Sequence, residues 1–153
     1  MEIEELIIAI TQKNQKKEGV DVYPPASEAK ISAFEEQIGF LLPADFREFY
    51  LCCDGFGCVD DIFNMIPLSQ IRNYPKDYGV NWFYFAEYMI YSDMWGLRIN
   101  PKGEYEIFNE GYPNHVLTSS LKDFLEIFLE GNVFEPGGLY EWQGERIKLG
   151  MNK

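Results

Sequence analysis

The side chains best suited to chemistry in this chain are one histidine and a large set of carboxylates. His115 stands between Asn114 and Val116, and no Gly-x-Ser-x-Gly motif or other positional signal offers it a nucleophile. A Ser–His or Cys–His pair formed in space stays open. A histidine at a strand edge, hydrogen-bonded to the backbone, is the simpler interpretation.

The cysteines and glycines do not form a metal or cofactor motif. Cys52 and Cys53 are adjacent and Cys58 leaves an odd number, so we expect buried free thiols and no disulfide framework. Gly55-Phe56-Gly57 lacks the third glycine of a dinucleotide loop, and no Walker sequence is present. Asp60-Asp61 does not continue into a calcium-loop pattern. The sequence therefore predicts no cofactor and no metal.

Two glutamates are the best remaining candidates for catalysis. Glu104 and Glu106 are two positions apart, so on one strand they would share a face and could flank a sugar as acid and base. Glutamates on the solvated face of a hairpin need no such role, and we expect the protein not to be an enzyme. A small carboxylate-dependent hydrolase is kept as the least favoured alternative.

Charge is the strongest compositional signal. The 153 residues include 13 basic and 25 acidic side chains, a formal net charge of −12, which argues against direct binding to nucleic acid or an anionic membrane. Nine acids lie between Glu104 and Glu145 against one basic residue, Lys122, and Asp54–Asp61 adds three acids and no base. Solubility alone explains scattered charges, but clusters favour a surface for a basic protein partner. The predicted partner-binding residues are Asp54, Asp60, Asp61, Glu104, Glu106 and Glu110.

The bulk properties fit one soluble domain. Hydrophobic residues make up 46% and aromatic residues 16% of the chain, which is typical of a packed globule of this length. Met1–Glu5 is acidic where a signal peptide is basic, and no apolar run approaches the roughly 20 residues of a membrane span. We expect a soluble, cytoplasmic protein in which residues 1–153 form a single domain.

One stretch, Leu41–Gly57, is predicted to position the rest of the chain. Pro43 suits the first turn of a helix, and Asp45 places a carboxylate beside the unpaired N–H groups of that turn. Gly55 lets the chain leave in the left-handed conformation. Between them an apolar face recurs at helical spacing, and we expect it to be buried. That face consists of Phe46, Phe49, Tyr50 and Cys53.

The other elements follow from periodicity and turn residues. We expect helices over 3–10, 27–38 and 120–131, the first fraying through the polar Thr11–Glu18 with its basic cluster Lys13, Lys16 and Lys17. Strands are expected over 61–67, 81–91, 95–100 and 104–108, with 112–117 as a further candidate and 68–72 as a short helical turn. Residues 19–25 are expected to be an extended connector, and 132–153 a C-terminal arm that packs an aromatic patch. This order indicates an α+β domain with one mainly antiparallel sheet.

The motifs and their order resemble the SUKH superfamily. Its Glu-x-x-x-Gly-x-x-Leu-Pro lead-in matches Glu35, Gly39, Leu42 and Pro43, and its Asp/Asn-Gly step after the Leu-Pro helix matches Asp54-Gly55. Further matches are Ile66-Pro67-Leu68, Trp95-Gly96 and the closing helix Ser119–Leu129. The resemblance covers residues 28–131 and implies the same α+β architecture.

The resemblance also supplies the functional expectation. The superfamily includes bacterial immunity proteins, which neutralise a cognate toxin, and yeast cell-wall assembly regulators. We expect an immunity protein (antitoxin) that occludes its toxin stoichiometrically. Many such toxins are nucleases, which must be basic where they hold phosphates, and an acidic protein associates quickly with such a groove. An intracellular regulatory scaffold like the fungal relatives is the alternative.

Overall fold

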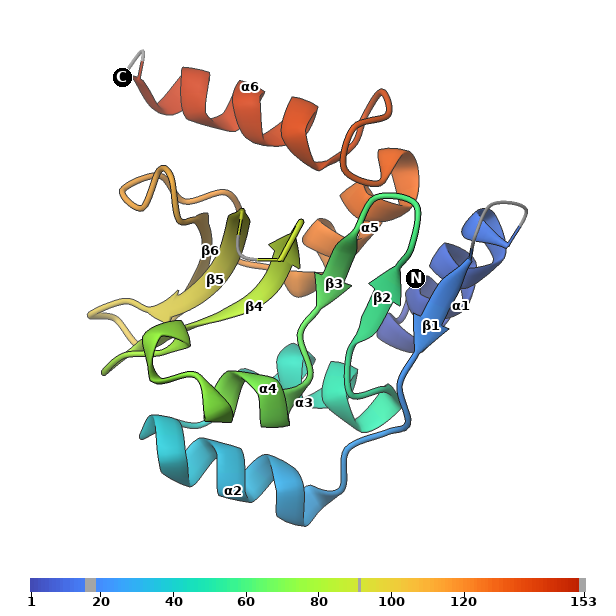
Figure 1. Cartoon of the computed structure of the whole chain (residues 1–153). Helices are drawn as coiled ribbons and strands as arrows, with labels where there is room; N and C mark the ends of the chain where they lie inside the picture. The colour runs from blue at the N-terminus through green and yellow to red at the C-terminus, as the bar shows by residue number, and fades with distance from the viewer. Residues whose placement is uncertain (16–18, 91, 152–153) are drawn as a thin grey trace.

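The computed structural model describes residues 1–15, 19–90 and 92–151 and contains a six-stranded sheet with helices packed on it (Figure 1). The strands are β1 (Val20–Val22), β2 (Phe56–Cys58), β3 (Phe63–Met65), β4 (Trp82–Tyr88), β5 (Asp93–Ile99) and β6 (Tyr105–Asn109). The helices are α1 (Ile3–Asn14), α2 (Glu28–Ile38), α3 (Ala44–Cys52), α4 (Leu68–Asn73), the 3-10 turn η1 (Pro75–Asp77), α5 (Leu121–Gly131) and α6 (Leu139–Met151). The predicted α+β class with an antiparallel sheet is confirmed.

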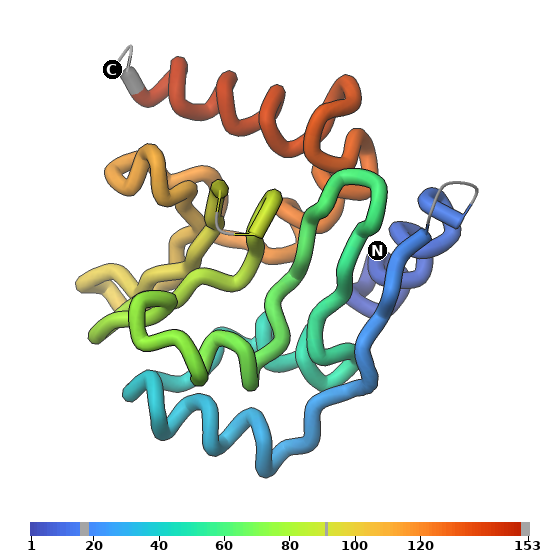
Figure 2. Tube along the Cα trace, viewed as in Figure 1, coloured from blue at the N-terminus to red at the C-terminus, as the bar shows by residue number. Residues whose placement is uncertain are grey.

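The sheet is a meander in which each strand pairs with the next one along the chain. The order is β1-β2-β3-β4-β5-β6, and every pair is antiparallel. Figure 2 shows that helices interrupt the meander twice. The connection from β1 to β2 contains α2 and α3, and the connection from β3 to β4 contains α4. In Figures 1 and 2, α2 and α4 lie at one end of the strands, whereas α6 lies at the opposite end.

One face of the sheet is covered by α1, α3 and α5, which lie behind the strands in Figure 1. The Phe63 ring centroid of β3 lies 4.5 Å from that of Phe128 and 6.5 Å from that of Phe124, both in α5. Phe46 of α3 contacts Phe85 of β4 at 5.0 Å. All of these side chains are fully buried. Aromatic pairs at such separations contribute about 0.5–1.5 kcal/mol each beyond the burial of their surface.

The predicted organising helix, α3, lies within this covering layer. Its apolar face is buried as predicted, because Phe46, Phe49 and Tyr50 are 0% exposed and Cys53 is 1% exposed. The Tyr50 hydroxyl donates to the Ile66 carbonyl oxygen at 2.9 Å, so the burial leaves no orphaned polar group there.

A β-bulge in β4 decides which side chains reach the uncovered face. The register passes from Tyr84 opposite Gly96 to Ala86 opposite Trp95, which makes Phe85 the extra residue. Phe85 packs on the helices, with its ring 5.2 Å from that of Phe124. After the bulge, Glu87 lies opposite Asn64 of β3 and points to the uncovered face.

Two serines begin helices as predicted. Ser27 Oγ accepts the Lys30 N–H at 3.1 Å at the start of α2, and Ser120 Oγ accepts the Asp123 N–H at 3.3 Å at the start of α5. At the end of α1, Lys13 Nζ donates to the Glu130 carbonyl oxygen at 3.1 Å. Its predicted companions Lys16 and Lys17 lie outside the described residues.

Three segments differ from their prediction. Residues 19–25 contain β1, which pairs with β2, and neither three-residue strand is long enough to show an alternating pattern. Residues 112–117 form no strand, because the N–H groups of Tyr112 and His115 close turns onto Asn109 and Tyr112. The C-terminal arm packs an aromatic patch as predicted, with the Tyr140 ring 5.3 Å from that of Phe134, but differs in forming the helix α6, whose Gln143 accepts the Trp95 indole N–H at 2.7 Å.

Candidate partner-binding face

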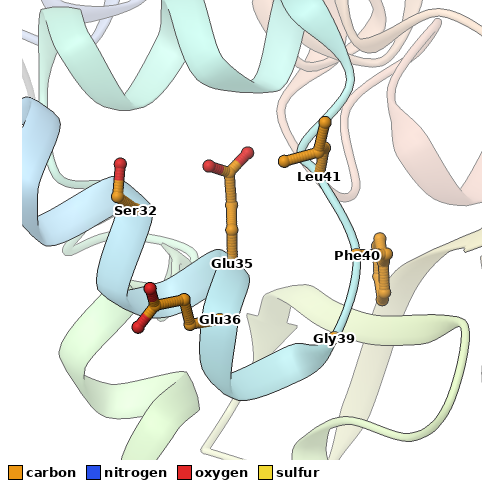
Figure 3. A pocket seen from close by; sticks show the side chains of 6 residues that line it. All are labelled: Ser32, Glu35, Glu36, Gly39, Phe40 and Leu41. Atoms are coloured by element: carbon orange, nitrogen blue, oxygen red, sulfur yellow. The ribbon is translucent and has the colours of Figure 1, made fainter.

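The SUKH-like lead-in forms a hydrogen-bonded junction between α2 and α3. Figure 3 shows Glu35 pointing from α2 toward α3, and its carboxylate accepts the Leu42 N–H at 2.7 Å and Arg47 Nη1 at 3.1 Å. Glu35 is 8% exposed, so these partners offset the loss of its hydration. Gly39 turns the chain between the two helices with a φ of +87°, which favours glycine. The hollow in Figure 3 is therefore the edge of a structural junction.

Asp54, one of the predicted partner-binding residues, is buried rather than displayed at the surface. It is 6% exposed; its Oδ1 accepts the Leu68 N–H at 2.9 Å, and its Oδ2 pairs with Lys30 Nζ at 2.6 Å. A Cβ on the following Gly55 would lie 2.2 Å from the Met65 carbonyl oxygen, and its φ is +90°. The Asp54-Gly55 step thus holds α2, α3 and α4 together, and Asp54 is not part of the exposed surface.

The other predicted carboxylates lie in three places. Asp60 and Asp61 are in the β2–β3 turn, where Asp61 Oδ2 accepts the Val133 N–H at 3.4 Å. Glu104 lies in the β5–β6 turn and precedes β6, so it does not share a strand face with Glu106, as the acid–base hypothesis supposed. Only Glu106 and Glu110 reach the uncovered face of the sheet.

Aromatic side chains line this uncovered face. Trp82 and Tyr84 of β4 have ring centroids 4.9 Å apart, and Phe108 of β6 lies 6.2 Å from Tyr84. A Cβ on Gly96, in the strand between them, would lie 2.9 Å from the Phe108 ring. The glycine therefore makes room for an aromatic side chain to lie against the strands.

Arg98 lies on this face and interacts with three partners. Its Nε donates to Glu106 Oε1 at 2.9 Å, its Nη1 donates to the Pro113 carbonyl oxygen, and its Cζ lies 4.8 Å from the centroid of the Phe108 ring. Burial acts to raise the pKa of Glu106, but hydrogen bonds from Arg98 and Asn100 outweigh it, and the pKa lies below its ordinary value. The carboxylate of Glu106 is therefore ionised at neutral pH.

A recess of about 510 Å³ opens beside Tyr84 on the same face. Burial, then the charges of Asp93 and Asp77, raises the pKa of Glu110 above its ordinary value. Burial, then Glu110 and Asp77, likewise raises the pKa of Tyr84. In both groups burial is the larger cause, and the neighbouring carboxylates add a smaller negative potential that favours a bound cation. The lining residues are Tyr74, Pro75, Lys76, Asp77, Tyr84, Met94 and Glu110.

The remaining candidates for chemistry lie apart from this face. His115 is half-buried in a turn, not at a strand edge, with its ring 6.4 Å from that of Tyr112. Burial raises the pKa of Cys53 to about 12, so the thiol is protonated at neutral pH. Among the described residues, no group of three or more His, Cys, Asp and Glu side chains is arranged to hold a metal ion. No helix in the described part of the chain has both the length and the apolarity needed to cross a membrane.

The sequence profile of the SMI1 / KNR4 family (SUKH-1) matches residues 25–127, from the segment before α2 to the middle of α5. The chain belongs to the SMI1 / KNR4 family. The match includes the Glu35 junction, the Asp54-Gly55 step and the whole uncovered face of strands β2 to β6. A search among curated proteins finds no match. For this SMI1 / KNR4 member, the motifs that predicted the family are therefore residues that build the fold, and the function has to be inferred from the surface.

The residues that line the recess carry little signal in the sequence. Asp77 lies two residues after Pro75 in a short turn. Tyr84 belongs to a run of aromatic residues whose composition does not distinguish the two faces of the strand. The available signal was the alternation of β4 up to Tyr84, which separates Trp82 and Tyr84 from Phe83. The turn that supplies Tyr74 and Asp77 gave no comparable signal.

Proposed function

We propose that this SMI1 / KNR4 protein is an immunity protein (antitoxin) that binds a cognate bacterial toxin in the cytoplasm and neutralises it by occlusion, without turnover. The observation that carries the proposal is the uncovered face of the sheet, where aromatic side chains and carboxylates meet while the opposite face is filled by helices. Membership of the family supports a protein-binding role. The net charge of −12 suits a basic partner.

The chemistry of this face fits a nuclease as the toxin. A nuclease holds phosphates with basic groups, so a surface of carboxylates competes directly with its substrate. Aromatic side chains such as Trp82 and Tyr84 supply the contact area that anchors protein interfaces. The outlying Asp60, Asp61 and Glu104 would act at longer range, by speeding the encounter.

The proposal predicts that a large toxin gene lies beside the gene for this chain. Co-expression of this chain with the toxic domain of that protein should restore growth, and the purified pair should form a 1:1 complex. Titration of the toxin should abolish its activity at equimolar antitoxin. Full inhibition at a small fraction of one equivalent would instead indicate turnover. Failure of both complex formation and protection would overturn the immunity proposal.

A further inference from the structure

The uncovered face already binds one guanidinium group, that of its own Arg98. The cation lies over the Phe108 ring, with Cζ 4.8 Å from the centroid, and donates to the carboxylate of Glu106 at 2.9 Å. The Pro113 carbonyl oxygen accepts a further N–H. An aromatic ring for the flat surface and oxygen atoms for the edge are the groups that a guanidinium requires.

The neighbouring recess repeats these groups around an empty volume. Tyr84, 6.2 Å from Phe108, supplies the aromatic ring, and Glu110 supplies a carboxylate. Asp77, which is 3% exposed, places a second carboxylate in the lining. Among the residues that line the recess the basic one is Lys76, and its side chain is exposed. The lining therefore contains the partners of a guanidinium and no guanidinium.

We propose that the recess receives one arginine side chain of the protein partner, with the guanidinium beside Glu110 and its plane against the Tyr84 ring. This proposal rests on the proposed function and specifies the chemical group that the face recognises. Pro75 and Met94 give apolar walls for the methylene groups of the arginine. Arginine fits better than lysine because a planar, weakly hydrated cation stacks on a ring and can donate two parallel hydrogen bonds to one carboxylate.

The electrostatics of the recess agree with this assignment. Glu110 is kept half-buried near Asp93 and Asp77, which raises its pKa and makes its ionisation unfavourable for folding. A bound cation relieves that repulsion, so binding should lower the pKa of Glu110 and should weaken as pH falls and the carboxyl becomes protonated. Carboxylates held at such positions are common in binding sites.

The direct test uses the full chain and two small probes, N-acetyl-arginine amide and its neutral isostere N-acetyl-citrulline amide. In an NMR titration, the arginine probe should shift the signals of Met94, Tyr84 and Glu110 with a millimolar Kd. The citrulline probe should bind at least about tenfold more weakly, because it has the same shape but no charge. Equal binding of both probes, or shifts that spread over the whole surface, would overturn the assignment.

Variants connect the effect to the recess. Glu110→Gln should weaken the arginine probe about tenfold, whereas Glu126→Gln, an exposed carboxylate on α5 at the covered side of the sheet, should leave it unchanged. Lys76→Ala should strengthen binding about two- to fivefold by removing a competing cation. Circular dichroism checks that each variant is folded, and Tyr84→Leu provides a second variant if one is not. Equal effects of Glu110→Gln and Glu126→Gln would contradict the proposal.

The protection assay separates this proposal from the proposed function. If the wild-type chain protects cells and Glu110→Gln protects equally well, with unchanged affinity for the toxin, the recess is not the contact and the immunity function stands. If the arginine probe binds in the recess but the wild-type chain neither binds the toxin nor protects, the immunity function fails and the recess remains a guanidinium site.

Discussion

On the helix-covered face of the sheet, Phe63, Phe85 and Trp95 are fully buried, and each contacts aromatic rings from α5. On the uncovered face, Trp82 and Tyr84 come from the same strand as Phe85, yet they stay half-buried, and Tyr84 lies in the recess with Glu110 and Asp77. Alternate residues of one strand thus serve two purposes. The covered face supplies most of the burial that holds the domain together, whereas the uncovered face retains aromatic surface that no helix removes from water.

The comparison also shows where the family motifs lie. Glu35 and Asp54 belong to neither face. They join helices through buried hydrogen bonds at the end of the strands where α2 and α4 lie. A search guided by motif residues alone therefore leads to the parts that determine the fold. The residues that would recognise a partner lie on the uncovered face, on strands β4 to β6 and in the adjoining turns.

The largest expected contrast is in stability. Phe46→Ala should lower the free energy of unfolding by about 3–5 kcal/mol, because it removes a fully buried ring and leaves a cavity. Tyr84→Ala, on the other face, should cost less than about 1.5 kcal/mol, because its ring is already partly in water. Urea denaturation measures both. Equal losses would show that the two faces do not differ in the way described.

The α2–α3 junction should fall between these values. Glu35→Ala leaves the Leu42 N–H without its acceptor in a buried position, so the free energy of unfolding should fall by about 1–3 kcal/mol. Binding to the toxin should be unchanged as long as the variant is folded. If the variant lost more affinity than its unfolded fraction accounts for, the junction would be part of the interface.

Charge reversal should separate the faces by association rate. Changing Glu104, Glu106 and Glu110 to Lys should lower the association rate with the toxin about tenfold or more at low ionic strength. The same change at Glu2, Glu4 and Glu5, at the start of α1 on the covered side, should have a smaller effect. Surface plasmon resonance at two salt concentrations tests both triple variants. Equal effects would show that the net charge of the protein, and not the position of its carboxylates, sets the association rate.

Glu110→Gln should have a smaller effect, with the opposite sign on stability. The pKa of Glu110 is higher in the folded state than in the unfolded state. The stability that the protonated form provides is therefore complete at a pH below the pKa of the unfolded state, and it is lost as the pH rises through the pKa of the folded state. As the pH rises, the free energy of unfolding of the glutamine variant should therefore increase relative to that of the wild type. The increase should be less than about 1 kcal/mol, because water screens a partly exposed carboxyl. Denaturation at pH 4 and pH 7 measures the difference. A variant less stable than wild type at pH 7 would contradict the burial and repulsion described.

The smallest effect is expected away from both faces. His115→Ala should leave the toxin affinity and the protection unchanged, because this side chain lies in a turn and packs on Tyr112. Stability should change by no more than about 0.5 kcal/mol. Loss of protection in a folded variant would restore a catalytic or ligand-binding role for the histidine.

Patterns that repeat along the sequence predicted the fold well. The spacing of Phe46, Phe49 and Tyr50 predicted a buried helix face, and the alternation around Pro101 predicted the β5–β6 hairpin. The strands β1 and β2 were missed because three residues contain too little alternation to distinguish a strand from a connector. Charge clustering carried no information on burial, which is why Asp54 was grouped with exposed acids. The recess joins residues from a turn, two strands and a loop, and such proximity in space cannot be derived from local sequence.

The extra residue of β4 bears on how this domain can change during evolution. Because Phe85 shifts the alternation by one position, every side chain after it in the strand points to the face opposite the one expected from plain alternation. Deletion of Phe85 would restore regular pairing of β4 with β5, so Glu87 and Tyr88 would keep their faces, while the covered face would lose the ring that packs on Phe124. A one-residue gap at this position in an aligned relative would therefore mark a chain whose covered face has been repacked while its exposed surface is kept.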